Sequence, residues 1–282
     1  MPATRVWLLT AIAMLAFAAN SLLCRMALAQ GHIDPASFTA LRLIAGAVML
    51  ALLVSVSAKP RAPVFVQGSW RGAFALFIYA AGFSFAYVEL NTATGALILF
   101  AAVQLCMIAF GLWQGERFSA LQWAGLVCAL AGLAYLLVPN ATRPDLWSAL
   151  LMAAAGVAWA VYSLLGKQSR GALFFTAGNF VKSLVFAAPL LWAFNDLFYV
   201  NAKGVALAIA SGALASGMGY ALWYALLPHL KAMTAASVQL SVPVLAALMG
   251  VVVLSEPLSL SLVLASIAVL AGVGLVICRS PR

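Results

Sequence analysis

The chain has 282 residues, of which 15 are Lys or Arg and 6 are Asp or Glu, so that only 7% are charged. A soluble domain usually carries about 25%, whereas this chain is 66% apolar and has a mean hydropathy of +1.10. A soluble protein of this size could not bury so much apolar surface. The composition therefore excludes a soluble enzyme, a disordered chain and a secreted disulfide scaffold, and it predicts an all-α protein with many membrane spans.

Apolar stretches long enough to cross a bilayer as helices, which takes roughly 20 residues, follow one another along the chain. Short polar linkers separate ten of them, at residues 6–29, 35–56, 72–90, 93–113, 120–138, 146–166, 174–193, 204–227, 233–254 and 260–278. The first stretch stays apolar well past residue 18, which favours a membrane helix over a cleaved signal peptide. We therefore expect ten transmembrane helices.

The basic residues predict the orientation, because cytoplasmic loops of membrane proteins carry an excess of Lys and Arg. With a cytoplasmic N-terminus, ten basic residues fall in cytoplasmic segments: Arg5, Lys59, Arg61, Arg71, Arg117, Lys167, Arg170, Lys231, Arg279 and Arg282. Two fall in outer loops, Arg143 and Lys203, and the remaining three lie within spans. Both termini are therefore expected in the cytoplasm.

The two halves of the chain resemble each other. Similar segments recur in the same order about 140 positions apart: residues 21–25 and 163–167, Arg42 and Lys182, 82–87 and 219–224, 94–96 and 234–236, 115–119 and 255–259, 130–132 and 270–272. The halves, 1–142 and 143–282, hold five spans each. Because five is odd, the second copy must enter the membrane in the opposite sense. Inverted five-helix repeats around a central cavity are a transporter architecture, and they predict transport by alternating access.

Small residues recur every four positions on three of the spans, as Ser211, Ala215 and Gly219, as Gly125 and Ala129, and as Ala268 and Gly272. Such faces let helix backbones approach closely within a membrane. They predict a tightly packed bundle.

Polar and aromatic side chains within the spans are the candidates for binding a substrate, because polar groups in a bilayer usually face the protein interior. They are Asn20, Tyr79, Phe83, Phe100, Gln104, Trp159, Tyr162, Ser163, Tyr220, Trp223, Tyr224 and Gln239, and the polar residues within the spans also include Ser21, Asn179 and Ser241. A cavity lined by such residues suits a small amphipathic organic molecule and lacks the charged rings that select inorganic ions. For any one of these residues, packing is the alternative, so the prediction concerns the group.

Two cations, Arg42 and Lys182, lie well inside spans, where a charge is costly and often functional. One hypothesis is that either residue receives a substrate carboxylate. The alternative, which long basic side chains favour, is snorkelling or pairing with carbonyl groups at a helix end. No Asp or Glu lies deep in a span. This absence favours facilitated transport, or a coupling route that the residues do not reveal.

Other classes of function find no support in the residues. The net charge of +9 comes from scattered basic residues, with no basic run typical of nucleic-acid binding. The four cysteines have no CxxC spacing, so neither a disulfide framework nor a zinc site is expected. Metalloprotease, hydrolase and phosphate-loop motifs are absent. We therefore expect no enzymatic activity, no metal and no cofactor.

The chain resembles the EamA-type, ten-helix branch of the drug/metabolite transporter superfamily. The residues that carry the resemblance are 40–43, 115–119, 130–132, 159–162, 241–244, 255–259 and 270–272, and Val103 stands where the family often has a proline. The resemblance implies ten helices around a cavity and export of metabolites across a bacterial inner membrane. Within the branch the chain is most similar to the aromatic amino-acid exporters of the YddG type, because Trp159 matches a cavity tryptophan of that type.

The expected function is therefore export of amino acids, especially those with aromatic or large apolar side chains, by a protein embedded in the lipid bilayer. Two alternatives stay open. One is a drug or nucleotide-metabolite carrier of the same fold, and the other is a membrane receptor or scaffold without transport. The substrate, the coupling ion and the oligomeric state do not follow from the residues.

Overall fold

The computed structural model describes residues 3–57, 63–113, 115, 119–137, 144–167, 171–226, 229, 238–239 and 241–278. These residues form helices joined by short connections, and their one extended pairing is an isolated bridge between Ile33 and Val200. The longer helices are α1 (Ala3–Leu28), α2 (Pro35–Ser55), α3 (Trp70–Ala86), α4 (Thr92–Trp113), α5 (Ala120–Leu137), α6 (Leu146–Lys167), α7 (Ala172–Ala193), α8 (Ala202–Ile209), α9 (Gly219–Leu226), α11 (Ser241–Leu254) and α12 (Leu260–Cys278).

Three short elements complete the described fold. The 3-10 turns η1 (Val64–Val66) and η2 (Asn195–Leu197) lie in connections. The π-helix η3 (Ala210–Met218) joins α8 to α9, so residues 202–226 form one continuous rod. The sequence predicted a single span at 204–227, but nothing in it predicted the wider turns. Of the predicted span at 233–254, residues 233–237 and 240 lie outside the described residues.

Polar side chains determine where several helices begin. Asp34 precedes α2 and accepts a hydrogen bond from the Ser37 N–H at 2.8 Å, while Pro35 occupies the first turn. At α5 and α12, the hydroxyls of Ser119 and Ser259 accept hydrogen bonds from the backbone N–H three residues further on. Such caps satisfy backbone donors that a helix N-terminus leaves without intrahelical partners. The two serines are 140 positions apart, so the predicted repeat extends to the helix caps.

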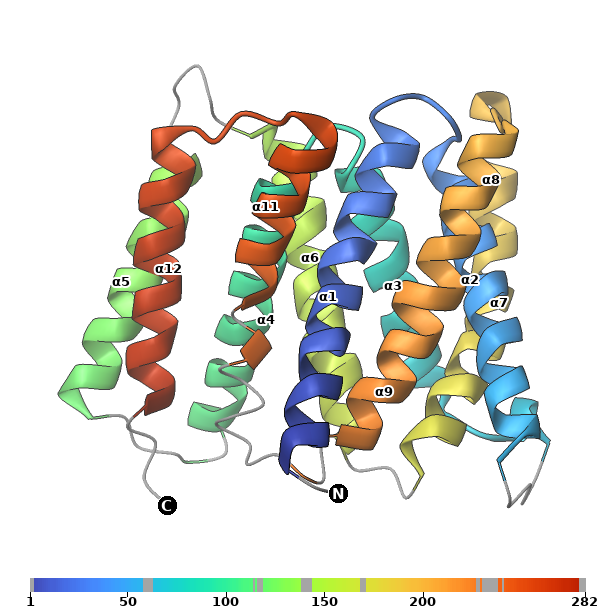
Figure 1. Cartoon of the computed structure of the whole chain (residues 1–282), viewed down its shortest axis with the longest axis horizontal. Helices are drawn as coiled ribbons and strands as arrows, with labels where there is room; N and C mark the ends of the chain where they lie inside the picture. Colours follow the sequence, from blue (N-terminus) through green and yellow to red (C-terminus); the bar gives the residue numbers. More distant parts are fainter. Residues whose placement is uncertain are drawn as a thin grey trace.

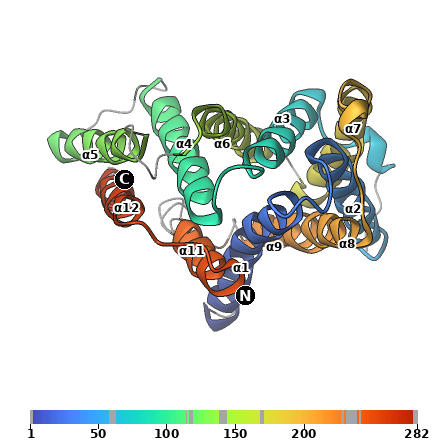
Figure 2. The same cartoon turned by 90° about the horizontal axis from the view of Figure 1, so that it is seen from above.

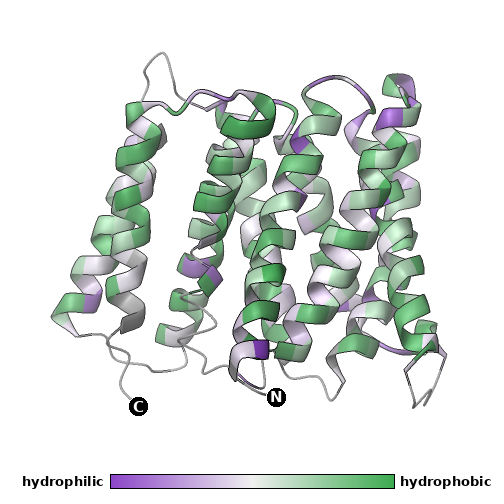
Figure 3. Cartoon of the chain, viewed as in Figure 1, coloured by the Kyte–Doolittle hydropathy of each residue, from purple (hydrophilic) through white to green (hydrophobic). Residues whose placement is uncertain are grey.

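The helices stand side by side, and most of their residues are hydrophobic along the length of each helix (Figures 1 and 3). Within the part of the chain that the structure describes, six helical segments are long and apolar enough to cross a membrane: Thr4–Leu28, Pro35–Ser55, Thr92–Trp113, Leu146–Gly166, Leu173–Ala193 and Ala202–Leu226. Shorter apolar helices cover Ala120–Gly132, Ser241–Leu254 and Leu260–Gly272. Large exposed side chains such as Trp113, Trp192 and Val252 would be costly in water but are compatible with lipid. The protein is an all-helical membrane protein.

Helices α5 and α12 pack as a pair at one end of the molecule (Figure 2). A Cβ atom added at Gly272 would lie 2.5 Å from the carbonyl oxygen of Gly125 and 2.6 Å from the amide nitrogen of Ala129. One added at Gly132 would lie 2.7 Å from the Cβ of Ala268. The structure therefore confirms the close packing that the small residues of these two spans predicted.

Candidate substrate cavity

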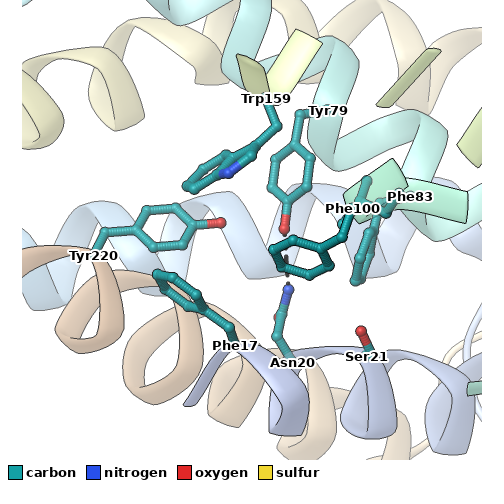
Figure 4. A pocket seen from close by; sticks show the side chains of 9 residues that line it. Phe17, Asn20, Ser21, Tyr79, Phe83, Phe100, Trp159 and Tyr220 are labelled. Carbon is teal, nitrogen blue, oxygen red and sulfur yellow. Dashed lines mark hydrogen bonds between the residues drawn. The ribbon is translucent and has the colours of Figure 1, made fainter. Parts of the chain in front are cut away.

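A cavity lies among α1, α3, α4, α6 and α9 (Figure 4). Its volume is about 20 Å³, which is room for about one water molecule. It is lined mainly by aromatic side chains, with Leu99 and a few polar groups among them: Phe17, Asn20, Ser21, Tyr79, Phe83, Leu99, Phe100, Trp159 and Tyr220. Residues from both halves of the chain thus meet in the centre. Any organic substrate would need these side chains to move apart.

Trp159 of α6 forms the centre of the aromatic cluster. Its ring centroid lies 5.0 Å from that of Tyr79 and 4.7 Å from that of Tyr220. Phe17 approaches Trp159 edge-on at 6.3 Å. Aromatic rings at these separations attract one another beyond the effect of burial alone, by about 0.5–1.5 kcal/mol per pair. The cluster therefore provides a preformed apolar surface for a flat or bulky side chain.

A chain of hydrogen bonds forms the polar end of the cavity. The hydroxyl of Tyr79 accepts a hydrogen bond from Asn20 Nδ2 at 3.2 Å and another from Arg42 Nη2 at 3.0 Å. The Ser211 hydroxyl donates to Asn20 Oδ1 at 2.6 Å, and Arg42 Nε donates to the Ser216 hydroxyl at 3.3 Å. Groups on α1 and α2 thus bond the Tyr79 hydroxyl directly, and two serines of η3 hold those groups in turn (Figure 4 shows the bond from Asn20).

Arg42 lies directly behind this polar end and is only 1% exposed. Its guanidinium carbon lies 5.0 Å from the ring centroid of Tyr79 and 4.9 Å from that of Phe83, both of which line the cavity. These cation–π contacts offset part of the cost of burying the charge. Among the described residues, Arg42 has no ion-pair partner, and its Nη1 atom has no hydrogen-bond acceptor.

A close contact between α2 and the π-helix η3 positions Arg42 behind the polar end of the cavity. A Cβ atom at Gly212 of η3 would collide with the backbone oxygen of Arg42, so only glycine allows α2 to approach η3 this closely. The contact brings Ser216 within hydrogen-bond distance of the guanidinium. Short π-helical segments are uncommon and are frequent at functional sites.

The predicted binding residues fall into two groups in the structure. Those that line the cavity are Asn20, Tyr79, Phe83, Phe100, Trp159 and Tyr220. Those that do not line it are Gln104, Tyr162, Ser163, Trp223, Tyr224 and Gln239. Among the second group, Tyr162 and Trp223 touch cavity residues, because their rings lie 5.6 Å from Trp159 and 6.0 Å from Phe17 respectively. The Ser163 hydroxyl donates to the Trp159 backbone oxygen, and Gln239 is half-buried.

Ser21, one of the polar residues identified within the spans, also lines the cavity, and two lining residues were absent from the predicted set: Phe17 and Leu99. The repeat could have identified Phe17, because it lies 142 positions before Trp159, the offset that also relates residues 21–25 to 163–167. Ser21 follows Asn20 at the same level of α1. No feature of the sequence distinguishes Leu99 from the other apolar residues of α4.

Lys182, the counterpart of Arg42 in the repeat, lies elsewhere. Its Nζ donates to the backbone oxygen of Gly68 at 3.2 Å and lies 5.8 Å from the ring centroid of Trp70. The side chain is half-buried, and it does not line the cavity. Lys182 thus bonds a backbone carbonyl, as one alternative expected, but this carbonyl lies in the connection before α3 and not at the C-terminal end of a long helix.

An ion pair joins several segments at one end of the cavity helices. Arg25 Nε, on the last turn of α1, lies 3.3 Å from Glu256 Oε1 in the connection between α11 and α12. The same guanidinium donates to the backbone oxygens of Tyr87 and Val88. Glu256 also accepts the N–H of Thr92 at the start of α4. One paired cation thus links α1, α3, α4 and α11.

A buried aromatic cavity with one polar end, enclosed by apolar helices, is the kind of site in which membrane transporters bind small organic molecules. The chain belongs to the EamA-like transporter family, which matches residues 4–138 and, a second time, residues 146–278. Members of this family are transporters, so the protein is a membrane transporter of small molecules and not an enzyme.

Individual relatives agree with this family. The chain is 53% identical over its full length to an uncharacterized protein of Pseudomonas aeruginosa, 97% of which is covered. It is 28% identical to the uncharacterized transporter YwfM of Bacillus subtilis, over 91% of this chain and 88% of that one. It is 30% identical to the threonine/homoserine exporter RhtA of Salmonella typhimurium, over 62% of this chain and 61% of the exporter. A solved crystal structure that is 20% identical has the same fold, with a TM-score of 0.70 over 99% of both chains.

Proposed function

We propose that this transporter is an alternating-access carrier that exports amino acids with aromatic or large apolar side chains across the bacterial inner membrane. The observation that carries the proposal is the aromatic cluster around Trp159, in which the ring centroids of Tyr79 and Tyr220 lie within 5.0 Å of the Trp159 ring centroid. Such a cluster would bind an apolar side chain by stacking and burial. The hydrogen-bonded end at Asn20 and Tyr79 would orient the polar head of the same molecule.

The proposed architecture is ten membrane crossings in two inverted repeats, 1–142 and 143–282. The pairing of the helices supports it. In one set of contacts α6 packs on α3 and α4, and in the other α1 packs on the rod formed by α8, η3 and α9 and on α11. Each set joins the first helix of one half to the third and fourth spans of the other half. The two halves exchange roles in these contacts, as expected for two copies related by a twofold axis. The family match to each half separately also supports the duplication.

The inverted orientation has support from one contact between the halves. Ile33, just after α1, forms a backbone bridge with Val200, just after α7. Asp34 and Tyr199 extend it, since the Asp34 N–H donates to the Tyr199 oxygen at 2.8 Å. Because α6 and α7 cross and return, α6 would begin at the membrane face where α1 ends. The proposed second copy thus enters from the opposite side, and the distribution of basic residues puts both termini in the cytoplasm.

The cavity volume supports a cycle in which the centre opens and closes. At about 20 Å³ it is far too small for an amino acid, so the described conformation is closed around the aromatic cluster. In the proposed cycle, the Arg25–Glu256 pair holds the outer ends of α1, α3 and α4 together. Its release would open the cavity outward, while the opposite ends of the helices close.

Flux measurements test this function directly. The purified protein, reconstituted in liposomes, should move labelled Phe, Tyr, Trp or Met faster than empty vesicles do, and Trp159→Ala should abolish that movement. A panel of all amino acids, with and without a pH gradient, also tests coupling. Absence of flux with every amino acid would refute the proposal, and a cell-based drug-tolerance screen would then test the drug-carrier alternative.

A second candidate follows from the exporter relative, whose name specifies threonine and homoserine. The hydroxyl groups of Ser211 and Ser216 and the Asn20 amide around the polar end could serve a short hydroxylated amino acid. The same flux panel separates the two candidates, because transport of threonine above phenylalanine would favour the smaller substrates.

A further inference from the structure

The polar end of the cavity has more hydrogen-bond donors than acceptors. Among the described residues Arg42 Nη1 has no partner, and the Tyr220 hydroxyl lies near the hydroxyls of Tyr79 and Ser216 without a well-formed hydrogen bond to either, although Arg42 and Tyr220 are at most 2% exposed. The Tyr79 oxygen already accepts two hydrogen bonds, from Asn20 and Arg42, so its own proton is left to donate. Among the described residues, no well-formed hydrogen bond takes that proton. Three buried donors therefore converge on one end of the cavity.

The charge at this end is also uncompensated. The acidic residues that the structure describes all lie outside the long helices, at Asp34, Glu89, Asp145, Asp196 and Glu256. Glu256 is occupied by Arg25 and Thr92, and Asp34 by Ser37 and Tyr199. A buried cation without an anion is unfavourable, and inside a membrane it indicates that a partner arrives from elsewhere.

We propose that this end of the cavity binds the carboxylate group of the transported molecule. The carboxylate accepts hydrogen bonds from the Tyr79 and Tyr220 hydroxyls, which both point toward the centre (Figure 4). Arg42 is a positioning residue: through its 3.0 Å bond it holds the Tyr79 oxygen, and its positive charge balances the negative charge of the ligand. The inference rests on the proposed amino-acid transport and extends it by assigning the head group.

The geometry separates the two ends of such a ligand. The donors lie beside α2, α3 and α9, whereas Phe17, Phe100 and Trp159 line the rest of the cavity and carry no charge. A molecule with a carboxylate at one end and an apolar side chain at the other would match both. An amide or a simple amine of the same shape would leave the guanidinium charge unbalanced, which is costly for a charge buried within a membrane.

The first test uses the unmodified protein in liposomes, with labelled phenylalanine as the transported probe. Three unlabelled competitors differ from it in the head group alone: phenylalaninamide, 3-phenylpropionate and 2-phenylethylamine. We expect 3-phenylpropionate to compete, and the amide and the amine to compete roughly tenfold or more weakly, as for loss of a hydrogen bond to a charged group. Equal competition by phenylalanine and its amide would overturn the inference.

The second test removes the charge. Arg42→Gln should raise KM for phenylalanine roughly 10- to 100-fold. It should also remove the preference for phenylalanine over phenylalaninamide. Arg42→Lys keeps a cation and should retain the preference with weaker binding. Lys203→Gln, which removes an exposed cation that donates a hydrogen bond to Gln30, is the control for net charge. An unchanged preference in Arg42→Gln would contradict the assignment, and the competitor test above decides it if that variant does not fold.

The results distinguish this inference from the function on which it rests. If no amino acid is transported, but labelled 3-phenylpropionate is and Arg42→Gln stops it, the carboxylate site stands and the amino-acid proposal fails. If amino acids are transported without regard to the head group, the amino-acid proposal stands and the carboxylate site fails.

Discussion

Arg42 and Lys182 occupy matching positions in the two halves of the chain, yet their surroundings differ. Arg42 is buried against two cavity rings and has an unpartnered Nη1 atom, whereas Lys182 is half-buried and bonded to the Gly68 oxygen. The same kind of charge at the same position in a repeat thus has two different environments. The comparison teaches that a repeat predicts where cations lie along the helices, but not which cation faces the cavity.

The helices that face each cation account for the difference. Gly212 lets η3 lie directly on α2, so that Ser216 and the cavity tyrosine Tyr79 reach Arg42. Lys182 instead faces the connection before α3, where Gly68 offers a free carbonyl and Trp70 a ring. A backbone oxygen satisfies an ammonium group locally, and no ligand is needed to complete the contact.

The largest expected effect comes from exchanging the two cations for neutral residues. Arg42→Gln should reduce kcat/KM for the transported amino acid roughly 10- to 100-fold, because it removes a charged donor behind the cavity. Lys182→Gln should cost about 1 kcal/mol of stability, as for one ordinary hydrogen bond, without changing the order of preferred substrates. Flux assays and thermal unfolding in detergent measure both. Equal losses of flux in the two variants would remove the distinction.

A backbone substitution tests how η3 positions Arg42. Gly212→Val should destabilise the protein by about 1–3 kcal/mol, because its side chain has no room against the backbone oxygen of Arg42 and the side chain of Ala45. Transport should fall with it, since Ser216 and Arg42 would separate. Gly274→Ala is the matched control, because no atom lies within 4 Å of the added methyl group. It should be neutral or stabilise α12 by up to about 1 kcal/mol. Similar melting temperatures of the two variants would contradict this explanation.

The paired cation offers a contrast to the unpaired one. Glu256→Ala leaves Arg25 and the Thr92 N–H without their acceptor, and should lower stability by about 1–3 kcal/mol. It should also raise the accessibility of a cysteine introduced at the end of α1 that carries Arg25, which the proposed topology places outside, to a membrane-impermeant thiol reagent. Glu256→Gln keeps one acceptor oxygen and should have a smaller effect on both measurements. A labelling rate unaffected by either substitution would show that the pair does not hold this end closed.

The smallest effect is expected for a hydroxyl outside the cavity. Tyr162 is buried next to Trp159, and among the described residues its hydroxyl lies near the polar atoms of Thr176 and Asn179 without a well-formed hydrogen bond to either. Removing an unsatisfied polar atom relieves its desolvation penalty, so Tyr162→Phe should be neutral or raise the melting temperature slightly. Tyr79→Phe removes an oxygen that accepts two hydrogen bonds, so it should be clearly destabilising. A large loss of stability in Tyr162→Phe would mean that its hydroxyl has an unrecognised partner.

Much of the helical structure could be predicted. Within lipid, each segment must form all its backbone hydrogen bonds internally as a helix, so each span is recognisable in the sequence as a long apolar stretch. The predicted span at 35–56 and the helix Pro35–Ser55 differ at one end by a single residue. The small residues at Gly125 and Gly272 also identified helices that touch, since their lack of side chain matters only where backbones approach. The π-helical turns of η3 left no comparable signal, because they depend on packing against α1 and α2.

The cavity was harder to predict, because successive side chains of a helix point in different directions and only some of them face the cavity. Successive residues turn by roughly 100°, so neighbours such as Trp223 and Tyr224 cannot both face the same point. Tyr224 shares a face with Tyr220 but lies about 6 Å further along the axis, beyond the residues that line the cavity. Sequence patterns identify a face, whereas depth and rotation are decided by neighbouring helices.

The extra width of η3 also has a mechanical consequence. A π-helical turn contains one residue more than an α-helical turn needs, and this surplus residue can pass along a helix without breaking it. If it moved one position out of Ala210–Met218 toward the C-terminus, the residues it passed would swing around the axis by roughly 100°. Tyr220 lies just past this segment. Such a shift within the rod formed by residues 202–226 would rotate the Tyr220 ring away from the cavity, while the two ends of the rod stay in place.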